Sequence, residues 1–241
     1  MDRMIYLAMA GAKAAMQRQD VVAANLANVS TTGFREELTA FRALPVTGDG
    51  ASTRVYAIES TPGYNPAAGP AQSTGRALDV AMTGNAWLAV QARDGTEAYT
   101  RAGALEVSPD GQLVGAGGLP VLGDGGPIEV PADAALQIAS DGTVSARVGG
   151  AKPQTIGRLK LVTPEAPLLR GDDGLFRAAG GELDADPAAR LTSGALEGSN
   201  VSPIGAMVAM IAAARQFEQQ MKMMQTSQET EASANKLLAP G

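Results

Sequence analysis

Cysteine and histidine are both absent from this chain of 241 residues. Without them the chain has no thiolate nucleophile, no imidazole base and no disulfide, and it lacks the commonest ligands of zinc and haem. Most classes of enzyme depend on one of these groups. We therefore expect a protein that is not an enzyme and that holds no cofactor and no metal.

Aromatic residues and basic clusters are scarce as well. Aromatic residues make up 4% of the chain against 45% for all hydrophobic residues, so any core must be built mainly from Ala, Val, Leu, Ile and Met. The formal net charge is -6, and no run of Lys or Arg alternates with aromatic residues. Binding to a phosphate backbone has little electrostatic support, and we expect no nucleic-acid partner.

Long hydrophobic runs are missing too. Residues 4–12 are apolar and end in small residues, as in a signal peptide, but Asp2 offsets the charge of Arg3 and the apolar pattern continues as a helix. Residues 203–214, the longest other run, fall short of the ~18 to 20 residues that cross a bilayer. We expect no cleaved signal peptide and no membrane insertion.

Residues 1–35 predict a helix followed by a sharp turn. Small and apolar residues recur at alternating steps of four and three, which is typical of a helix with an apolar seam over residues 2–28. The seam comprises Ile5, Met9, Ala12, Met16, Gln19, Ala23 and Leu26. Turn formers occupy residues 30–33, and Gly33 can take the positive φ that ends a helix.

Residues 193–241 predict a second helix. Ser202 followed by Pro203 is typical of an N-cap and a first helical position, so the helix is expected to begin there. Its seam comprises Met207, Met210, Ala214, Phe217, Met221, Met224, Gln228, Glu231, Asn235 and Leu238. The seam turns polar at Gln228, so the last turns either set register by pairing polar groups with a neighbour or form a solvated end.

Between the helices the pattern changes to that of short strands and tight turns. Six Asp-Gly pairs, each a strong hairpin signal, begin at Asp49, Asp94, Asp110, Asp124, Asp141 and Asp173. Strand-like runs cover residues 87–90, 105–107, 112–114, 128–130, 144–148 and 158–162. Residues 76–192 therefore predict a compact β domain, and residues 36–75, rich in Gly, Pro, Ser and Thr, an extended connector. The expected fold class is α+β, with the terminal helices packed as a coiled-coil-like pair beside a central β-rich domain.

Two amphipathic helices at opposite ends of a chain bury their seams only against each other or against other molecules. The ordinary alternative is a two-helix hairpin within the chain. Nine of the ten methionines lie in the terminal segments. Methionine adapts to neighbours of different shape, which favours assembly, although filling gaps in a core poor in aromatics would use it equally well.

Four segments carry a resemblance to a known family. They are residues 25–35 (Asn-Leu-Ala-Asn-Val-Ser-Thr-Thr-Gly-Phe-Arg), 196–201 (Leu-Glu-Gly-Ser-Asn-Val), 78–90 and 99–103. Together they resemble the flagellar rod and hook axial proteins, and the first two stand in the family's order near opposite ends of the chain. The opening residues 1–9 and the modest length are most similar to proximal-rod members, with distal-rod members as the alternative.

This resemblance implies a structural subunit of the bacterial flagellar basal-body rod. Such a subunit is exported by the flagellar type III apparatus without signal cleavage and polymerises into a helical drive shaft in the periplasm, which transmits torque and forms the export channel. The implied partners are copies of itself, earlier proximal-rod subunits and the distal rod protein. The terminal helices would line the inside and the β domain would face outward.

The residues expected at the subunit interface follow from the two seams and the motif. They are Ile5, Met9, Met16, Ala23, Asn25, Leu26, Asn28, Gly33, Phe34, Met207, Met210, Ala214, Phe217, Met221, Met224, Gln228, Asn235 and Leu238. For Asn25 and Asn28 the alternative is local capping or solvation, and for Phe34 it is packing within the chain.

Two other classes of function compete with assembly. An enzyme would have to use carboxylate pairs such as Asp172 with Asp173 or Asp184 with Asp186, yet these acids stand in turn-like stretches. A secreted binding module would use Trp87 and Tyr99 as anchors, although aromatic residues in strands usually belong to a core.

Overall fold

The computed structural model describes the backbone of residues 2–45 and 55–238, and the side chains of residues 5–42, 44–45 and 63–233. The chain divides into two compact units. Unit 1 comprises residues 1–29, 36–65 and 201–241, and unit 2 comprises residues 30–35 and 66–200. The expected division into residues 1–35, 36–75, 76–192 and 193–241 stays a prediction about domains, and the two units divide the chain at other places.

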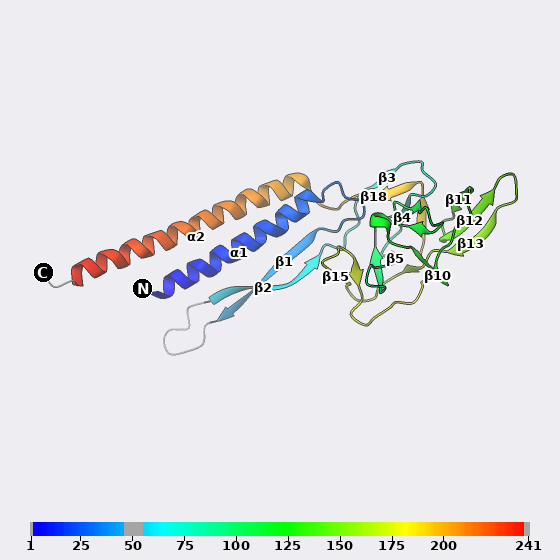
Figure 1. The fold of residues 1–241 in the computed structure, drawn as a ribbon. Coiled ribbons are helices and arrows are strands. Elements are labelled where there is room, and N and C mark those ends of the chain that lie inside the picture. The colour runs from blue at the N-terminus through cyan, green and yellow to red at the C-terminus, as the bar shows by residue number, and fades with distance from the viewer. Residues whose placement is uncertain (1, 46–54, 239–241) are drawn as a thin grey trace. The chain divides into compact units, whose positions relative to one another are not determined.

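Unit 1 is built on a pair of long helices, as the sequence predicts. α1 spans Asp2–Ala27 and α2 spans Pro203–Leu238. They lie side by side and run in opposite directions, and together with the central strands they confirm the α+β class (Figure 1). The side-chain oxygen of Ser202 accepts a hydrogen bond from the amide of Gly205 at 3.2 Å, so Ser202 caps α2 and Pro203 takes the first helical position.

Small residues fill the seam between α1 and α2. Ala8, Ala12 and Ala15 of α1 are buried, as is Ala213 of α2. At Gly11 the helices come so close that an added methyl group would lie 2.8 Å from Cδ of Gln220. At two turns of α1 the residue buried in the helix pair is the alanine that precedes the predicted seam methionine, and Met9 and Met16 themselves are more than half exposed.

A two-stranded antiparallel ribbon completes unit 1. β1 (Glu37–Pro45) pairs with β2 (Val55–Tyr64), with a bulge between Leu38 and Ala40, and both strands contact α1. The sequence predicted an extended connector here and missed the pairing, because Ser, Thr, Pro and Gly interrupt its strand formers. Asp49, the first Asp-Gly site, falls outside the described residues.

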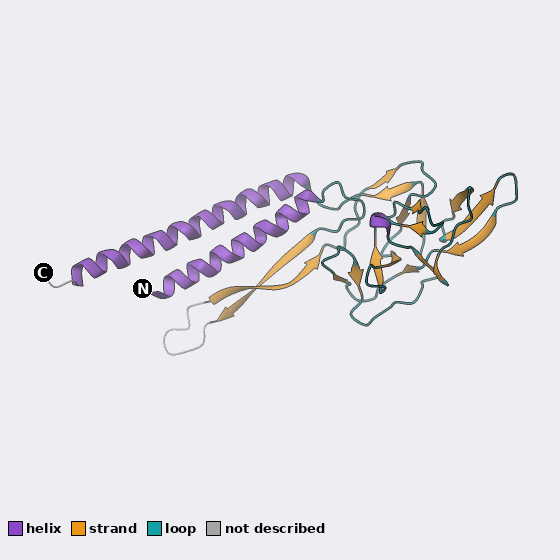
Figure 2. Ribbon diagram, in the orientation of Figure 1, coloured by secondary structure: helices purple, strands orange, loops and turns teal. Residues whose placement is uncertain are grey.

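Unit 2 consists of short antiparallel strands joined by loops (Figure 2). A five-stranded sheet has the order β14-β5-β6-β16-β15, a three-stranded sheet has the order β11-β12-β13, and the remaining strands pair as β17-β4, β18-β3, β7-β8 and β10-β9. The strands are β3 (Ala71–Ser73), β4 (Val80–Met82), β5 (Trp87–Gln91), β6 (Glu97–Thr100), β7 (Glu106–Val107), β8 (Leu113–Val114), β9 (Leu122–Gly123), β10 (Gly126–Pro127), β11 (Ala134–Ile138), β12 (Thr143–Val148), β13 (Gln154–Arg158), β14 (Leu161–Val162), β15 (Leu169–Arg170), β16 (Phe176–Arg177), β17 (Leu191–Ser193) and β18 (Ala195–Glu197).

The core of unit 2 is aliphatic, as the composition requires. Leu88, Leu105 and Leu113 have no exposed surface, and they pack with other buried Val, Leu, Ile and Ala side chains. Trp87 and Tyr99 are each only 1% exposed. These two aromatic side chains therefore belong to the interior and are not surface anchors for a ligand.

Four of the Asp-Gly pairs close hairpins of one design. In each turn, the residue two positions before the aspartate accepts a backbone hydrogen bond from the glycine and donates one to the residue after the glycine. In the first of these turns, Ala92 accepts from Gly95 and donates to Thr96, both at 2.9 Å. The other three turns are centred on Asp110, Asp141 and Asp173. The glycine of each turn has a positive φ, which other residues rarely adopt. The predicted strand at residues 128–130 is wrong, since only an isolated bridge at Glu129 forms there.

Candidate assembly surface and motif cluster

Three motif segments meet inside unit 2 around the carboxylate of Glu197. Arg35 donates from Nη1 to Oε1 of Glu197 at 2.5 Å. Arg101 donates from Nε to Oε2 at 2.8 Å, and its Nη2 lies 2.5 Å from the same oxygen. The three residues are between 1% and 3% exposed. We call Arg35, Arg101 and Glu197 the motif cluster.

Backbone carbonyls hold the rest of the Arg101 guanidinium. It donates to the carbonyl of Met82 at 3.0 Å, to that of Gly84 at 3.1 Å, and also to that of Ala86. Burial lowers the pKa of Arg101 from its ordinary value, and the carboxylate of Glu197 opposes that shift. Because a buried charge costs free energy unless it is paired, the single carboxylate is essential to two guanidinium groups.

The turn after α1 fits tightly into this cluster. Gly33 has φ +69° and donates its amide to the carbonyl of Glu197 at 2.8 Å, and any Cβ added there would collide with the backbone of Arg101. Phe34 is 7% exposed, and the guanidinium of Arg170 lies 4.6 Å from its ring centre. The structure thus shows the packing within the chain that the sequence left open for Phe34. A role of Gly33 and Phe34 between subunits stays a prediction.

The two motif asparagines have partners within unit 1. Asn25 is 4% exposed, and its side chain exchanges two hydrogen bonds with the backbone of Glu37, at 2.9 Å to the carbonyl and 2.8 Å from the amide. This pair fixes the end of α1 to the beginning of β1. The amide group of Asn28 donates to the carbonyl of Ala24 at 2.9 Å, which caps the helix end. The Asn28 contact matches the local capping that the sequence left open, whereas Asn25 is buried and bonds to a strand 12 positions along the chain.

Unit 1 exposes large apolar side chains on both helices. Ile204, Met207, Val208 and Ile211 recur at steps of three and four, so they form one face of α2, which we call the α2 stripe. Their exposed fractions are 77%, 52%, 61% and 56%. On α1, Tyr6, Met9 and Met16 are each more than half exposed. A contiguous apolar patch on a single chain marks a surface that contacts another molecule.

The other residues expected at an interface divide by exposure. Ala23, Met221 and Gln228 are exposed, whereas Ile5, Leu26, Met210, Ala214, Phe217 and Met224 are partly buried in the helix pair. Asn235 and Leu238 lie on the helical backbone of α2, but their side chains fall outside the described residues. The α2 stripe was largely missed from the sequence, which nominated only Met207 of its four members.

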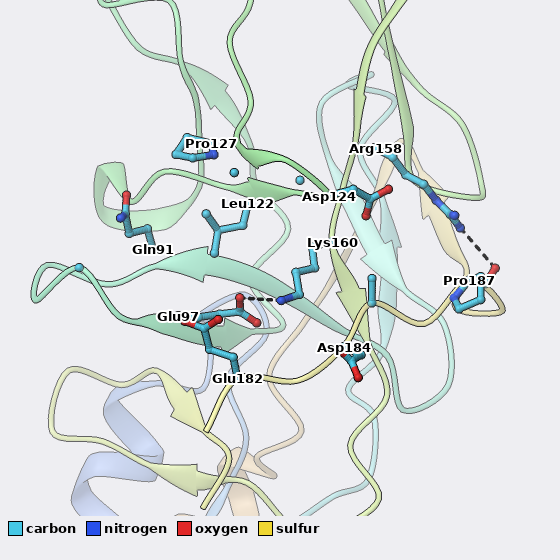
Figure 3. A pocket seen from close by; sticks show the side chains of 14 residues that line it. Gln91, Glu97, Leu122, Asp124, Pro127, Arg158, Lys160, Glu182, Asp184 and Pro187 are labelled. Carbon is cyan, nitrogen blue, oxygen red and sulfur yellow. Dashed lines mark hydrogen bonds and ion pairs between the residues drawn. The ribbon is translucent and has the colours of Figure 1, made fainter. Parts of the chain in front are cut away.

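An open depression of about 730 Å³ in unit 2 has Glu97, Arg158 and Lys160 among its lining residues (Figure 3). Lys160 lies 2.7 Å from the Glu97 carboxylate, which also accepts a hydrogen bond from the hydroxyl of Tyr99 at 2.8 Å. Arg158 donates to the backbone carbonyls of Asp141 and Pro187. The two basic side chains of the depression are therefore both held by acceptors within unit 2.

Two of the four carboxylates considered for catalysis, Asp173 and Asp186, stabilise turns. Asp173 accepts from Arg177 at 2.7 Å and from the amide of Leu175 at 3.1 Å. Asp186 accepts from the hydroxyl of Thr163 at 2.6 Å and from the amide of Ala188 at 2.8 Å. Among the residues that the structure describes, no group of three or more acidic residues is arranged to hold a metal ion.

Neither helix of the described chain is long and apolar enough to cross a membrane. The features of both units, a closed β unit and an exposed apolar helix face, define a structural protein that works through its surface.

Three segments of the chain match known protein families. Residues 5–35 match the family described as "Flagella basal body rod protein", residues 81–146 match "Flagellar hook protein FlgE/F/G D1 domain", and residues 192–237 match "Flagellar basal body rod FlgEFG protein C-terminal". Arg35, Arg101 and Glu197 each lie in a different one of these segments.

Similar proteins agree with the family matches. The chain is 49% identical to the flagellar basal-body rod protein FlgF of Salmonella typhimurium and 47% identical to that of Escherichia coli, in each case over 99% of both chains. It is 32% identical to the flagellar basal-body rod protein FlgG of Bacillus subtilis, over 95% of this chain and 96% of the relative. The chain belongs to the flagellar basal-body rod protein family. It is a structural protein and not an enzyme, as its composition predicts.

Proposed function

We propose that this chain is a proximal-rod subunit that polymerises through the helices of unit 1. The observation that carries the proposal is the exposed α2 stripe, whose four large apolar side chains have no cover within unit 1. Identity to two relatives named FlgF exceeds identity to the relative named FlgG, which favours the proximal over the distal position in the rod. The distal position is the alternative.

Polymerisation explains what an exposed apolar face is for. When the stripe of one subunit packs on a different surface of the next, the contact is heterologous, and repeated heterologous contacts that do not close into a ring build a helical filament. The partners would be copies of the chain, earlier proximal-rod subunits and the distal rod protein. Many such helix contacts make a stiff shaft that transmits torque and encloses the export channel.

Export follows from the same proposal. The subunit would leave the cell body through the flagellar type III apparatus without signal cleavage and join the rod in the periplasm. Subunits would then support motility only once they are incorporated in a basal body.

Deletion of the gene tests the proposal. Non-motile cells whose purified basal bodies end before the distal rod in electron micrographs would support a proximal-rod subunit. The full-length chain should restore both rods and swimming, whereas a chain lacking residues 202–241 should restore neither. Basal bodies with a complete proximal rod and no distal rod would favour the distal position, and normal swimming after deletion would refute the proposal.

A further inference from the structure

Methionine is distributed very unevenly between the two units. Nine of the ten methionines belong to unit 1, and Met82 is the one in unit 2. Met82 lies in β4 and is 4% exposed. Among the methionines whose side chains the structure describes, the five most exposed are Met9 at 54%, Met16 at 55%, Met207 at 52%, Met221 at 37% and Met223 at 46%, all on α1 or α2. We call these five the exposed methionines.

Among the described side chains, the exposed methionines offer the sulfur atoms that an oxidant reaches most readily. The chain has no cysteine, so no thiol competes for peroxide. Hydrogen peroxide transfers one oxygen to a methionine thioether: the O–O bond breaks, an S=O bond forms, sulfur loses two electrons and the peroxide becomes water. The product, methionine sulfoxide, is polar and is returned to methionine by a sulfoxide reductase that consumes thiols.

Oxidation would act on the surface through which the chain is proposed to assemble. Met207 belongs to the α2 stripe, between Ile204 and Ile211, and Met9 and Met16 lie with Tyr6 on the exposed part of α1. A sulfoxide at any of these positions puts a polar S=O group where a neighbouring subunit would bury a thioether. An unpaired polar group in an apolar interface weakens association by roughly tenfold or more.

We propose that the exposed methionines are an oxidation site that controls assembly of this subunit. The inference rests on the proposed polymerisation through unit 1 and adds its regulation. Before assembly the five thioethers are open to peroxide, and the sulfoxides keep the damaged subunit out of the growing structure. After assembly the neighbouring subunit covers them and protects them. A sulfoxide reductase restores the free subunit, so the block is reversible.

The first measurement is the rate of oxidation at each methionine. The purified full-length chain is treated with dilute hydrogen peroxide and digested, and sulfoxide is quantified by mass spectrometry. The exposed methionines should oxidise at least about tenfold faster than Met82, because the sulfur of Met82 is buried. Equal rates at Met82 and Met207 would overturn the inference.

The second measurement is self-association of treated and untreated protein, followed by sedimentation velocity. Untreated protein should form polymers, treated protein should need at least about tenfold higher concentration, and a methionine sulfoxide reductase with dithiothreitol should restore association. Circular dichroism of the treated chain checks that the helices persist. Polymers that form equally well after the five sites are oxidised would overturn the inference but leave the proposed function standing. Failure of the untreated chain to associate would overturn both.

Matched variants separate this surface from general damage. A chain with all five exposed methionines changed to leucine keeps an apolar surface of similar volume, so it should polymerise and resist peroxide. Changing the same five to glutamine imitates the polarity of the sulfoxide and should block association without peroxide. Met82→Leu is the control and should leave sensitivity to peroxide unchanged. A five-leucine chain that is as sensitive as the original would refute the inference.

Discussion

The two units use the same residue types in opposite ways. In unit 2 most of the large apolar side chains are buried, hydrogen bonds close the turns, and even the charged motif residues are buried against one another. In unit 1 the buried seam is made of alanine, while isoleucine, valine and methionine remain outside. Unit 2 thus buries most of its apolar side chains within itself, whereas unit 1 leaves several of its largest apolar side chains exposed.

The largest expected effect comes from placing charges on the exposed apolar face of unit 1. Ile204→Asp combined with Ile211→Asp puts two charges into the α2 stripe, and burying either charge in an interface is strongly unfavourable. We expect complete loss of swimming, measured by complementation of the deletion strain. The free subunit should melt at the same temperature as the original, because both positions are exposed.

A polar position on the same helix supplies the control. Gln219 is exposed and already polar, so Gln219→Asp should support normal swimming. Full motility of the doubly charged stripe variant would contradict the role proposed for this surface.

The next largest effect concerns the buried motif cluster of unit 2. Glu197→Ala leaves Arg35 and Arg101 buried without their carboxylate, and breaking a buried pair in this way costs about 3 to 5 kcal/mol. Denaturant unfolding followed by the fluorescence of Trp87 measures it, because both guanidinium groups lie 5.9 Å from the Trp87 ring centre. Glu182→Ala, at an exposed acid of the depression, should cost less than about 0.5 kcal/mol. Equal costs for the two variants would show that the motif cluster does not stabilise unit 2.

A smaller effect tests the close fit of the turn after α1. Gly33→Ala combines an unfavourable positive φ with a collision against the Arg101 backbone, and we expect a loss of at least about 2 kcal/mol. Gly84 has a similar φ, +63°, and open space around it. Gly84→Ala should therefore cost only the backbone term, about 1 kcal/mol. Identical losses by thermal melting would mean that the Gly33 turn does not rest on Arg101.

The smallest effect is a dependence on pH. The hydrogen bond from Arg177 lowers the pKa of Asp173 below its ordinary value of 3.8. A carboxylate whose pKa is lowered by folding contributes stability above the unfolded value, and that stability is lost as pH falls below about 4. Because the pair is partly exposed, Asp173→Asn should cost less than about 1 kcal/mol at pH 7 and nothing near pH 2. A cost that persists at low pH would show that the charge is not responsible.

The sequence predicted the helices well because their caps and periodicity are local. It left open which side of α1 faces α2, since residues 4–10 are apolar all round and the helical period alone does not choose a face. The side of α1 that faces α2 is the one where the two helix backbones can come close together. Alanine and Gly11 are small enough to allow this approach, and methionine is too large. The Asp-Gly turns could be predicted as well, because their signal, like that of the helix caps, lies in a few consecutive residues.

The motif cluster was hidden for the opposite reason. Each of the residues Arg35, Arg101 and Glu197 is at least 66 positions from the next along the chain. Charged residues close to glycines usually indicate a solvated loop. Their burial depends on long-range pairing such as β3 with β18, which brings Glu197 opposite Ala71. A long-range contact of this kind produces no periodic pattern in the sequence. Only the resemblance of the segments to a known family therefore pointed to these residues.

The order of the elements along the chain has a consequence for synthesis. α1 opens unit 1 and α2 closes it, and the intervening residues include all of unit 2. The helix pair joins residues almost the whole chain apart, so it forms late and only in a polypeptide that has been made to its final helix. A product of interrupted translation that ends before Pro203 can still form most of the β structure, yet it presents no α2 stripe. A truncated subunit of this kind therefore lacks the surface through which the chain is proposed to assemble.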